Sequence, residues 1–109
     1  MGYIYLIKER EFLHDSIVKV CQIQNYNNII KRHPKWSKLL YVIHVEDSYK
    51  ILHLLIDEMK YKFNHKTFEY GYKYFNGDCN EMITFINESI NGIVYNGDYV
   101  SPNKRKKYH

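Results

Sequence analysis

The amino-acid sequence predicts an α/β fold of the α+β kind, with a small, three-stranded, mainly antiparallel sheet flanked by helices. Three observations lead to this prediction. Two short runs of β-branched and aromatic residues, 3–7 and 17–21, stand near the start of the chain with a polar link between them. Residues 39–45 form a third apolar run of strand length. Residues 46–63 then carry apolar side chains at helical spacing.

The first two strands are expected to be antiparallel neighbours. Glu9, Arg10 and Glu11 interrupt the apolar pattern after the first strand, and Asp15 and Ser16 are typical turn residues before the second. Residues 29–32 predict a short helix that ends before Pro34, because the residue before a proline disfavours the helical conformation. The long apolar run at 39–45 predicts a central strand.

Two amphipathic helices follow. Asp47 and Ser48 offer an N-cap for the helix expected over 46–63. A second helix is expected to begin near Asp78, with Glu81 completing a capping box, and to end at Gly92. Beyond it, the Asn-Gly pair at 96–97 lies between apolar pairs at 94–95 and 99–100, which predicts a terminal β-hairpin.

The net charge of +4 is concentrated at the end of the chain. Four of the 16 basic residues lie within 104–107, so residues 1–100 hold twelve basic and all 12 acidic residues. We therefore expect a balanced domain over residues 1–100 and a basic, flexible tail over 101–109. The high isoelectric point does not by itself indicate a basic face on the domain.

Other classes of protein are not favoured by the sequence. It has no signal peptide and no apolar run of the roughly 18 residues that a membrane helix needs, so an intracellular location and no membrane partner are expected. Two cysteines do not make a disulfide framework, and both thiols are expected to be free. The histidines lack the spacing of a zinc site, so no cofactor is expected unless the chain is a nuclease.

The order of these segments resembles the GIY-YIG nuclease domain, especially the compact branch found in large DNA viruses and phages. The resemblance covers residues 2 to about 90 and rests on three segments. They are Gly2-Tyr3-Ile4-Tyr5-Leu6-Ile7 in the first strand, Val18-Lys19-Val20-Cys21 in the second, and Gly71-Tyr72-Lys73-Tyr74-Phe75-Asn76-Gly77-Asp78 before the last helix. The His33-Pro34-Lys35-Trp36-Ser37 segment also looks like the Tyr-Pro-Lys-Gly-Ser loop of the viral branch.

The resemblance implies a site for cleavage of a phosphodiester bond by water and one metal ion. Such chemistry needs a base, a cation that stabilises the phosphorane charge and a carboxylate that holds the metal. Tyr5 matches the tyrosine of the first strand, and Tyr3 is an equal candidate because strand alternation places both on one face. Lys19 stands where the second strand carries Tyr or Lys. Tyr5 as a packed core residue is the alternative interpretation.

Three positions depart from the family pattern. Cys21 replaces the glycine that ends the second strand, Ile29 stands at the place of the helix arginine, and Lys73 stands at the place of the metal-binding glutamate. A protonated lysine repels Mg²⁺ or Mn²⁺ instead of binding it. Glu69, one helical turn earlier, is the alternative catalytic and metal-binding residue if cleavage is retained.

Basic residues near aromatic ones predict contacts with nucleic acid. The candidates cluster around Trp36, at Lys73 and in the tail. They are Lys31, Arg32, Lys35, Trp36, Lys73, Lys104, Arg105, Lys106 and Lys107. Solvated surface charge is the alternative interpretation for Lys31 and Arg32, and a solubilising end is the alternative for the tail.

The leading hypothesis is a catalytically degenerate GIY-YIG-like viral protein that binds nucleic acid or a host or viral protein. The first alternative is an active, metal-dependent endonuclease in which Tyr5 and Glu69 take part. The second alternative is a small structural or self-associating protein, with Tyr95 and Tyr99 in its interface. The oligomeric state does not follow from the sequence.

Overall fold

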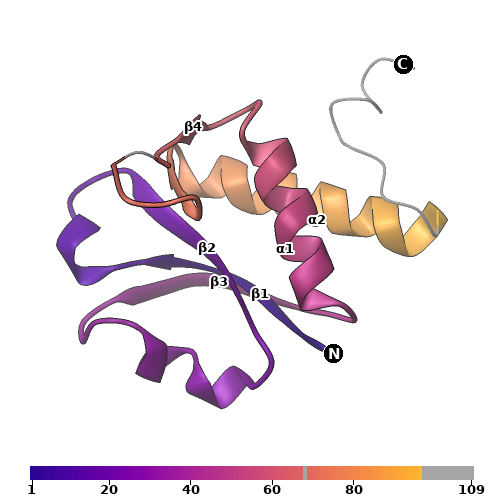
Figure 1. Ribbon diagram of the computed structural model, residues 1–109, viewed down its shortest axis with the longest axis horizontal. Helices are drawn as coiled ribbons and strands as arrows, with labels where there is room; N and C mark the ends of the chain where they lie inside the picture. The colour runs from indigo at the N-terminus through magenta and orange to yellow at the C-terminus, as the bar shows by residue number, and fades with distance from the viewer. Residues whose placement is uncertain (68, 97–109) are drawn as a thin grey trace. The chain divides into compact units, whose positions relative to one another are not determined.

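The computed structural model describes residues 1–67 and 69–96. It divides into two units, residues 1–79 and a second unit that begins at Asn80, and each is described by itself. The first unit contains every strand of the described chain, three short 3₁₀ turns and one long helix (Figure 1). The second unit consists, in its described part, of the helix α2 from its second residue onward.

The sheet has five strands, which corrects the prediction of three. In spatial order they are β3 (Lys38–Val45), β1 (Gly2–Lys8), β2 (Ile17–Ile23), β5 (Tyr74–Asn76) and β4 (Asn64–His65). Every neighbouring pair is antiparallel. The two additional strands, of two and three residues, lie within the segment that was expected to be a loop. They are too short to show any alternation in the sequence.

The apolar run at 39–45 forms an edge strand and not the central strand predicted from its composition. Strand β3 pairs with β1, and most of its side chains are half-buried. Strand β2 occupies the middle of the sheet instead. An apolar run of this length is compatible with both positions, because composition alone does not report which of a strand's edges is paired.

Helix α1 (Ser48–Met59) covers one face of the sheet, where it contacts β1 and β2 (Figure 1). Asp47 caps it by accepting a hydrogen bond from the Lys50 amide at 3.1 Å, and the helix is shorter at both ends than the predicted range 46–63. Gly2 of β1 lies against Ser48 of α1, so the even-numbered residues of β1, including the buried Ile4 and Leu6, are on the face that α1 covers. The buried Ser48 hydroxyl donates to Gln22 Oε1 at 2.9 Å, which ties the start of α1 to β2.

The opposite face carries the odd-numbered residues of β1 and β2. A second apolar cluster forms there around Tyr5, Ile7, Cys21, Ile23 and Ile29. Ile29 comes from the segment expected to be one short helix, which is instead two 3₁₀ turns, Tyr26–Asn28 and Ile30–Arg32. A further 3₁₀ turn, Arg10–Phe12, follows β1.

Helix α2 (Cys79–Asn96) is longer than predicted. It continues through Gly92, which was expected to end it, because one glycine costs only about 1 kcal/mol in a helix interior. The helical spacing predicts a buried stripe of Met82, Ile83, Ile86 and Ile90. Met82, Ile86 and Ile90 are buried, whereas Ile83 is half-buried and Phe85 is buried in addition. Residues 94–96 are helical and not the first strand of a hairpin, and the remainder of the predicted hairpin lies outside the described residues.

Candidate functional site

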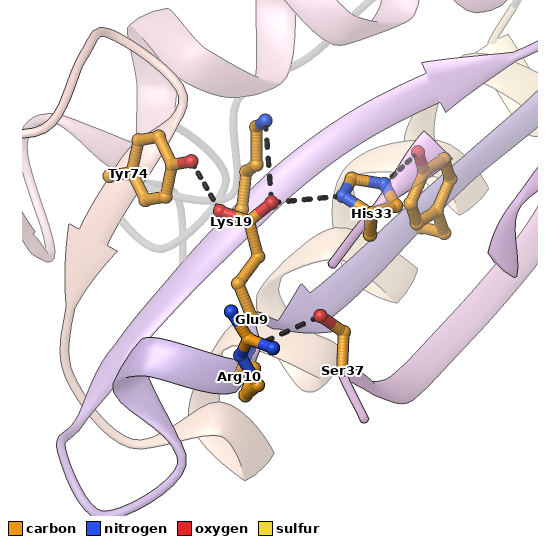
Figure 2. Close-up of polar contacts among 7 residues, drawn as sticks. Glu9, Arg10, Lys19, His33, Ser37 and Tyr74 are labelled. Atoms are coloured by element: carbon orange, nitrogen blue, oxygen red, sulfur yellow. Dashed lines mark hydrogen bonds and ion pairs between the residues drawn. The ribbon is translucent and has the colours of Figure 1, made fainter. Parts of the chain in front are cut away.

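The polar centre of the first unit is the carboxylate of Glu9, which is buried at the end of β1 (Figure 2). It continues the alternation of Tyr5 and Ile7, and so lies on the same side of the sheet as these residues. Lys19 and Tyr74 are register partners on β2 and β5, so they share that face as well. Figure 2 shows the side chains of Lys19, His33 and Tyr74 directed at the carboxylate from three different segments.

Three groups contact Glu9. Tyr74 donates its hydroxyl proton to Oε1, and His33 Nδ1 lies 3.0 Å from Oε2. The Lys19 ammonium lies 3.8 Å from the same Oε2 and 5.2 Å from the centre of the Tyr74 ring. A buried carboxylate is stable only when it is paired and hydrogen-bonded, and this one is both.

His33 links Glu9 to Tyr5. Its Nε2 lies 2.6 Å from the Tyr5 hydroxyl, and its side chain is almost completely buried. An ionised carboxylate can only accept, so Nδ1 carries the proton that His33 donates to Glu9. For a neutral imidazole Nε2 is then the acceptor, and the Tyr5 hydroxyl donates to it.

The ionisation of the site follows from burial and these hydrogen bonds. Burial alone would raise the pKa of Glu9, but the bonds from Tyr74 and His33 and the charge of Lys19 together lower that pKa below its ordinary value. Burial raises the pKa of Tyr5 far above its ordinary value, and burial followed by the bond to Glu9 does the same to the pKa of Tyr74. Both tyrosines therefore stay protonated at neutral pH and act as donors.

Arg32 lies close to Tyr5 and is not only solvated. Its Nη1 donates to the Gln22 carbonyl oxygen at 3.1 Å, and its charge and hydrogen bond act against the burial that raises the pKa of Tyr5. Ile29, at the place where the resemblance expects an arginine, is fully buried in the apolar cluster. Arg32, three residues after Ile29, is therefore the arginine that lies near Tyr5 of the first strand.

The other residues named for cleavage lie apart from this centre. Tyr3 packs beside the apolar cluster, with its ring 5.6 Å from that of Tyr26. Glu69 is exposed and pairs with Lys66 at 3.2 Å. In the described part of the chain, no group of three or more His, Cys, Asp or Glu side chains is placed to hold a metal ion.

Apart from Lys31 and Arg32, which lie in the 3₁₀ turn Ile30–Arg32, the aromatic and basic residues named for nucleic acid divide into three sets. Trp36 is 72% exposed, and the Lys35 ammonium lies 5.5 Å from its ring centre. Lys73 lies beside the Tyr72 ring at 5.6 Å, while its carbonyl oxygen accepts from the Val20 amide. Residues 104–107 lie outside the described residues.

Trp36 occupies an unusual backbone conformation. Ser37 N donates to the Pro34 carbonyl oxygen at 3.1 Å, which closes a four-residue turn with Trp36 in its third position. Its φ of 76° is the only positive φ of a non-glycine residue in the described chain. A type II turn requires a positive φ at this position and normally places glycine there.

The turn is held at both of its ends. His33 precedes it and is fixed between Tyr5 and Glu9, while the Ser37 hydroxyl accepts from the Arg10 amide at 3.1 Å (Figure 2). The Glu9 cluster therefore positions the Trp36 turn. Of this cluster, the sequence predicts Tyr5 and Lys19 as site residues but gives no such prediction for Glu9, His33 or Tyr74. The alternation Tyr5-Ile7-Glu9 is the signal from which Glu9 could have been found.

These features define an α+β domain in which a cluster around one buried carboxylate, that of Glu9, holds an exposed turn that carries Trp36. Searches of protein-family models, curated proteins and solved structures found no match to this chain. The search for membrane-spanning segments, made over the described residues, found no helix long and apolar enough to span a bilayer.

Proposed function

We propose that this chain is a GIY-YIG-like domain, of the viral kind, that binds nucleic acid and does not cleave it. The observation that carries the proposal is the exposed Trp36 in a backbone conformation that favours glycine. The Tyr-Pro-Lys-Gly-Ser loop of the family has glycine at this place. A tryptophan here costs about 1–2 kcal/mol in backbone strain, and the ring is 72% exposed, so burial of the ring does little to offset that cost.

A strained, exposed aromatic residue on a fixed turn is suited to stacking on a nucleobase. Stacking on an aromatic side chain contributes about 1–3 kcal/mol per base and tolerates any sequence. Lys35 lies beside the ring, and the exposed Lys38 follows the turn, so phosphates next to a stacked base would meet positive charge. Because His33 and Ser37 already hold the turn, little conformational entropy is lost on binding.

The site chemistry supports binding over cleavage. Tyr5 is 1% exposed and its hydroxyl is engaged by His33, and Lys73 stands where the resemblance expects the metal-binding glutamate. The carboxylate that the structure does bury, Glu9, is neutralised by Lys19 and two further donors. Glu9 and the residues that contact it therefore serve to position the Trp36 turn through His33.

The experiment measures the binding of a fluorescently labelled single strand by anisotropy, at low and moderate salt. Trp36→Ala is expected to weaken binding about tenfold or more, and Trp36→Phe to retain most of it. Trp36→Gly is the sharpest variant, because it removes the ring and also the strain. We expect Trp36→Gly to lose binding while its free energy of unfolding stays within about 1 kcal/mol of wild type or rises.

Tyr61→Ala is the matched control, since Tyr61 is an exposed aromatic residue on another segment. Equal binding by wild type and Trp36→Ala would overturn the proposal. Magnesium- or manganese-dependent nicking of supercoiled DNA that is abolished by Glu69→Gln would support the endonuclease alternative instead.

A second candidate function, self-association, is favoured by the edge strand β3. Residues 39–43 are five consecutive apolar or aromatic residues with half-buried side chains, and β3 pairs with β1 alone among the described strands. Long apolar edges of this kind pair with other chains. Light scattering tests it: a dimer that becomes a monomer in Val42→Lys would support self-association, and a monomer at all concentrations would contradict it.

A further inference from the structure

A pocket of about 360 Å³ opens beside the end of β2, and none of its described lining residues contacts Glu9. Its walls come from the end of β2, the two 3₁₀ turns and the start of α1. Its volume lies at the lower end of the range for small-ligand sites, about 300–1,000 Å³. Such a space suits one small molecule or one unit of a polymer.

The charge of the pocket is positive. Lys31 and Arg32 are its two charged lining residues, and none of the described lining residues is acidic. Asp47, the acid nearest in sequence to the Tyr49 wall, is committed to capping α1. The pocket therefore favours an anion.

Arg32 is held in place before any ligand arrives. Its guanidinium donates to the Gln22 carbonyl oxygen at 3.1 Å, and its charge acts on the nearby Tyr5 side chain by lowering the pKa that burial raises. A guanidinium has about five N–H donors in a planar fork, so these contacts leave donors that can bind phosphate. A pre-oriented arginine loses little entropy when it binds.

Besides binding an anion, the pocket offers a surface on which an aromatic base could stack, and Tyr49 provides it. It lies at the start of α1 with 59% of its surface exposed, and it forms one wall of the pocket. Asn25 and Asn28 add amide groups to the lining. Asn25 Oδ1 accepts from the Asn27 amide, which orients that side chain. Amides of this kind read the donor and acceptor edge of a base.

From this combination we propose that the pocket binds a nucleoside monophosphate unit. Lys31 and Arg32 bind the phosphate, Tyr49 stacks on the base, and the two asparagines contact the base edge. The unit is either a free nucleotide or one nucleotide of a strand, since both present the same chemistry. This proposal does not depend on the Trp36 turn, because none of the pocket residues belongs to that turn.

The test titrates adenosine 5′-monophosphate into the full, isotope-labelled chain and follows amide chemical shifts. Shifts are expected at the pocket residues. Lys31→Glu and Tyr49→Ser are each expected to weaken binding about tenfold. Their matched controls, Lys50→Glu and Tyr61→Ser, change exposed residues of the same type outside the pocket and are expected to bind as wild type does. Adenosine is expected to bind more weakly than the monophosphate, and inorganic phosphate to compete with it.

A labelled single strand of thymidylate distinguishes the two sources of the nucleotide. If Lys31→Glu and Tyr49→Ser weaken binding of the strand while the free nucleotide shows no saturable binding, the pocket proposal is supported. Its ligand is then one nucleotide of a strand and not a free nucleotide. Unchanged binding of both probes by these two variants overturns the pocket proposal. If Trp36→Ala alone then weakens strand binding, the proposed function stands without the pocket. Nucleotide binding in the pocket with no strand binding supports the pocket and overturns the proposed function.

Discussion

His33 Nδ1 lies 3.0 Å from Glu9 Oε2, although the two residues are 24 positions apart in the sequence. This bond joins the end of β1 to the start of the Trp36 turn. Tyr74 brings β5 to the same carboxylate, and Lys19 brings β2. One buried acid thus fixes three separate segments, and its loss is expected to affect both the fold and the turn.

The first prediction concerns the free energy of unfolding of Glu9→Gln. The variant keeps the shape of the side chain but loses the charge that pairs with Lys19 and one of the acceptor oxygens. We expect a loss of about 1–3 kcal/mol, measured by urea unfolding, because hydrogen bonds to charged groups contribute that much. Glu11→Gln is the matched control at an exposed acid nearby and is expected to change stability by less than about 0.5 kcal/mol.

The second prediction concerns the pH dependence of stability. The pKa of Glu9 is lower in the folded chain than in the unfolded chain, so the unfolded state binds the proton more readily as pH falls. The contribution of Glu9 is therefore complete at neutral pH and is lost below about pH 4. The difference in urea midpoint between wild type and Glu9→Gln is expected to shrink from pH 7 to pH 3. A difference independent of pH would show that the carboxylate charge contributes nothing.

The parts of the fold that the sequence predicted are those with local signals. The first two strands and α1 are long enough for alternation or helical spacing to be read directly. Strands β4 and β5 have two and three residues, and β5 is defined by pairing with β2 over a separation of more than 50 residues. No local pattern encodes such a pairing. The edge position of β3 is likewise a property of the assembled sheet.

The candidate site shows the same division. Tyr5 and Lys19 could be named because they lie in regular strands, where alternation fixes the face. The sequence predicts only that Glu9 ends the first strand, which is confirmed. Its burial depends on contacts with His33 and Tyr74, which come from distant segments of the chain. The strain at Trp36 could not be read from residue type, because tryptophan does not indicate a positive φ.

The third prediction concerns the two thiols. Cys21 is buried in the apolar cluster, and burial raises the pKa of its thiol, whereas Cys79 is partly exposed. A thiol reagent acts on the thiolate, so in the folded chain we expect one thiol to react rapidly and one to react only on unfolding. Cys79→Ser is expected to remove the fast phase and Cys21→Ser the slow one. Two fast thiols in wild type would contradict the burial of Cys21.

The fourth prediction concerns Gly2, whose lack of a side chain is required by close packing. A Cβ at this position would lie 2.5 Å from Ser48 Oγ and 3.0 Å from the Ile23 carbonyl oxygen. Gly2→Ala is therefore expected to displace Ser48 from Gln22 and to lower the free energy of unfolding by about 1–3 kcal/mol.

A double-mutant cycle identifies the cause. Ser48→Gly removes the side chain that the new methyl group would meet, so the cost of Gly2→Ala is expected to be smaller in the Ser48→Gly background. The Ile23 carbonyl contact remains in that background and is expected to retain part of the cost. If Gly2→Ala lowers the free energy of unfolding equally in both backgrounds, then Ser48 moves away from the new methyl group without any loss of stability. The start of α1 would then not be fixed by its contact with β1.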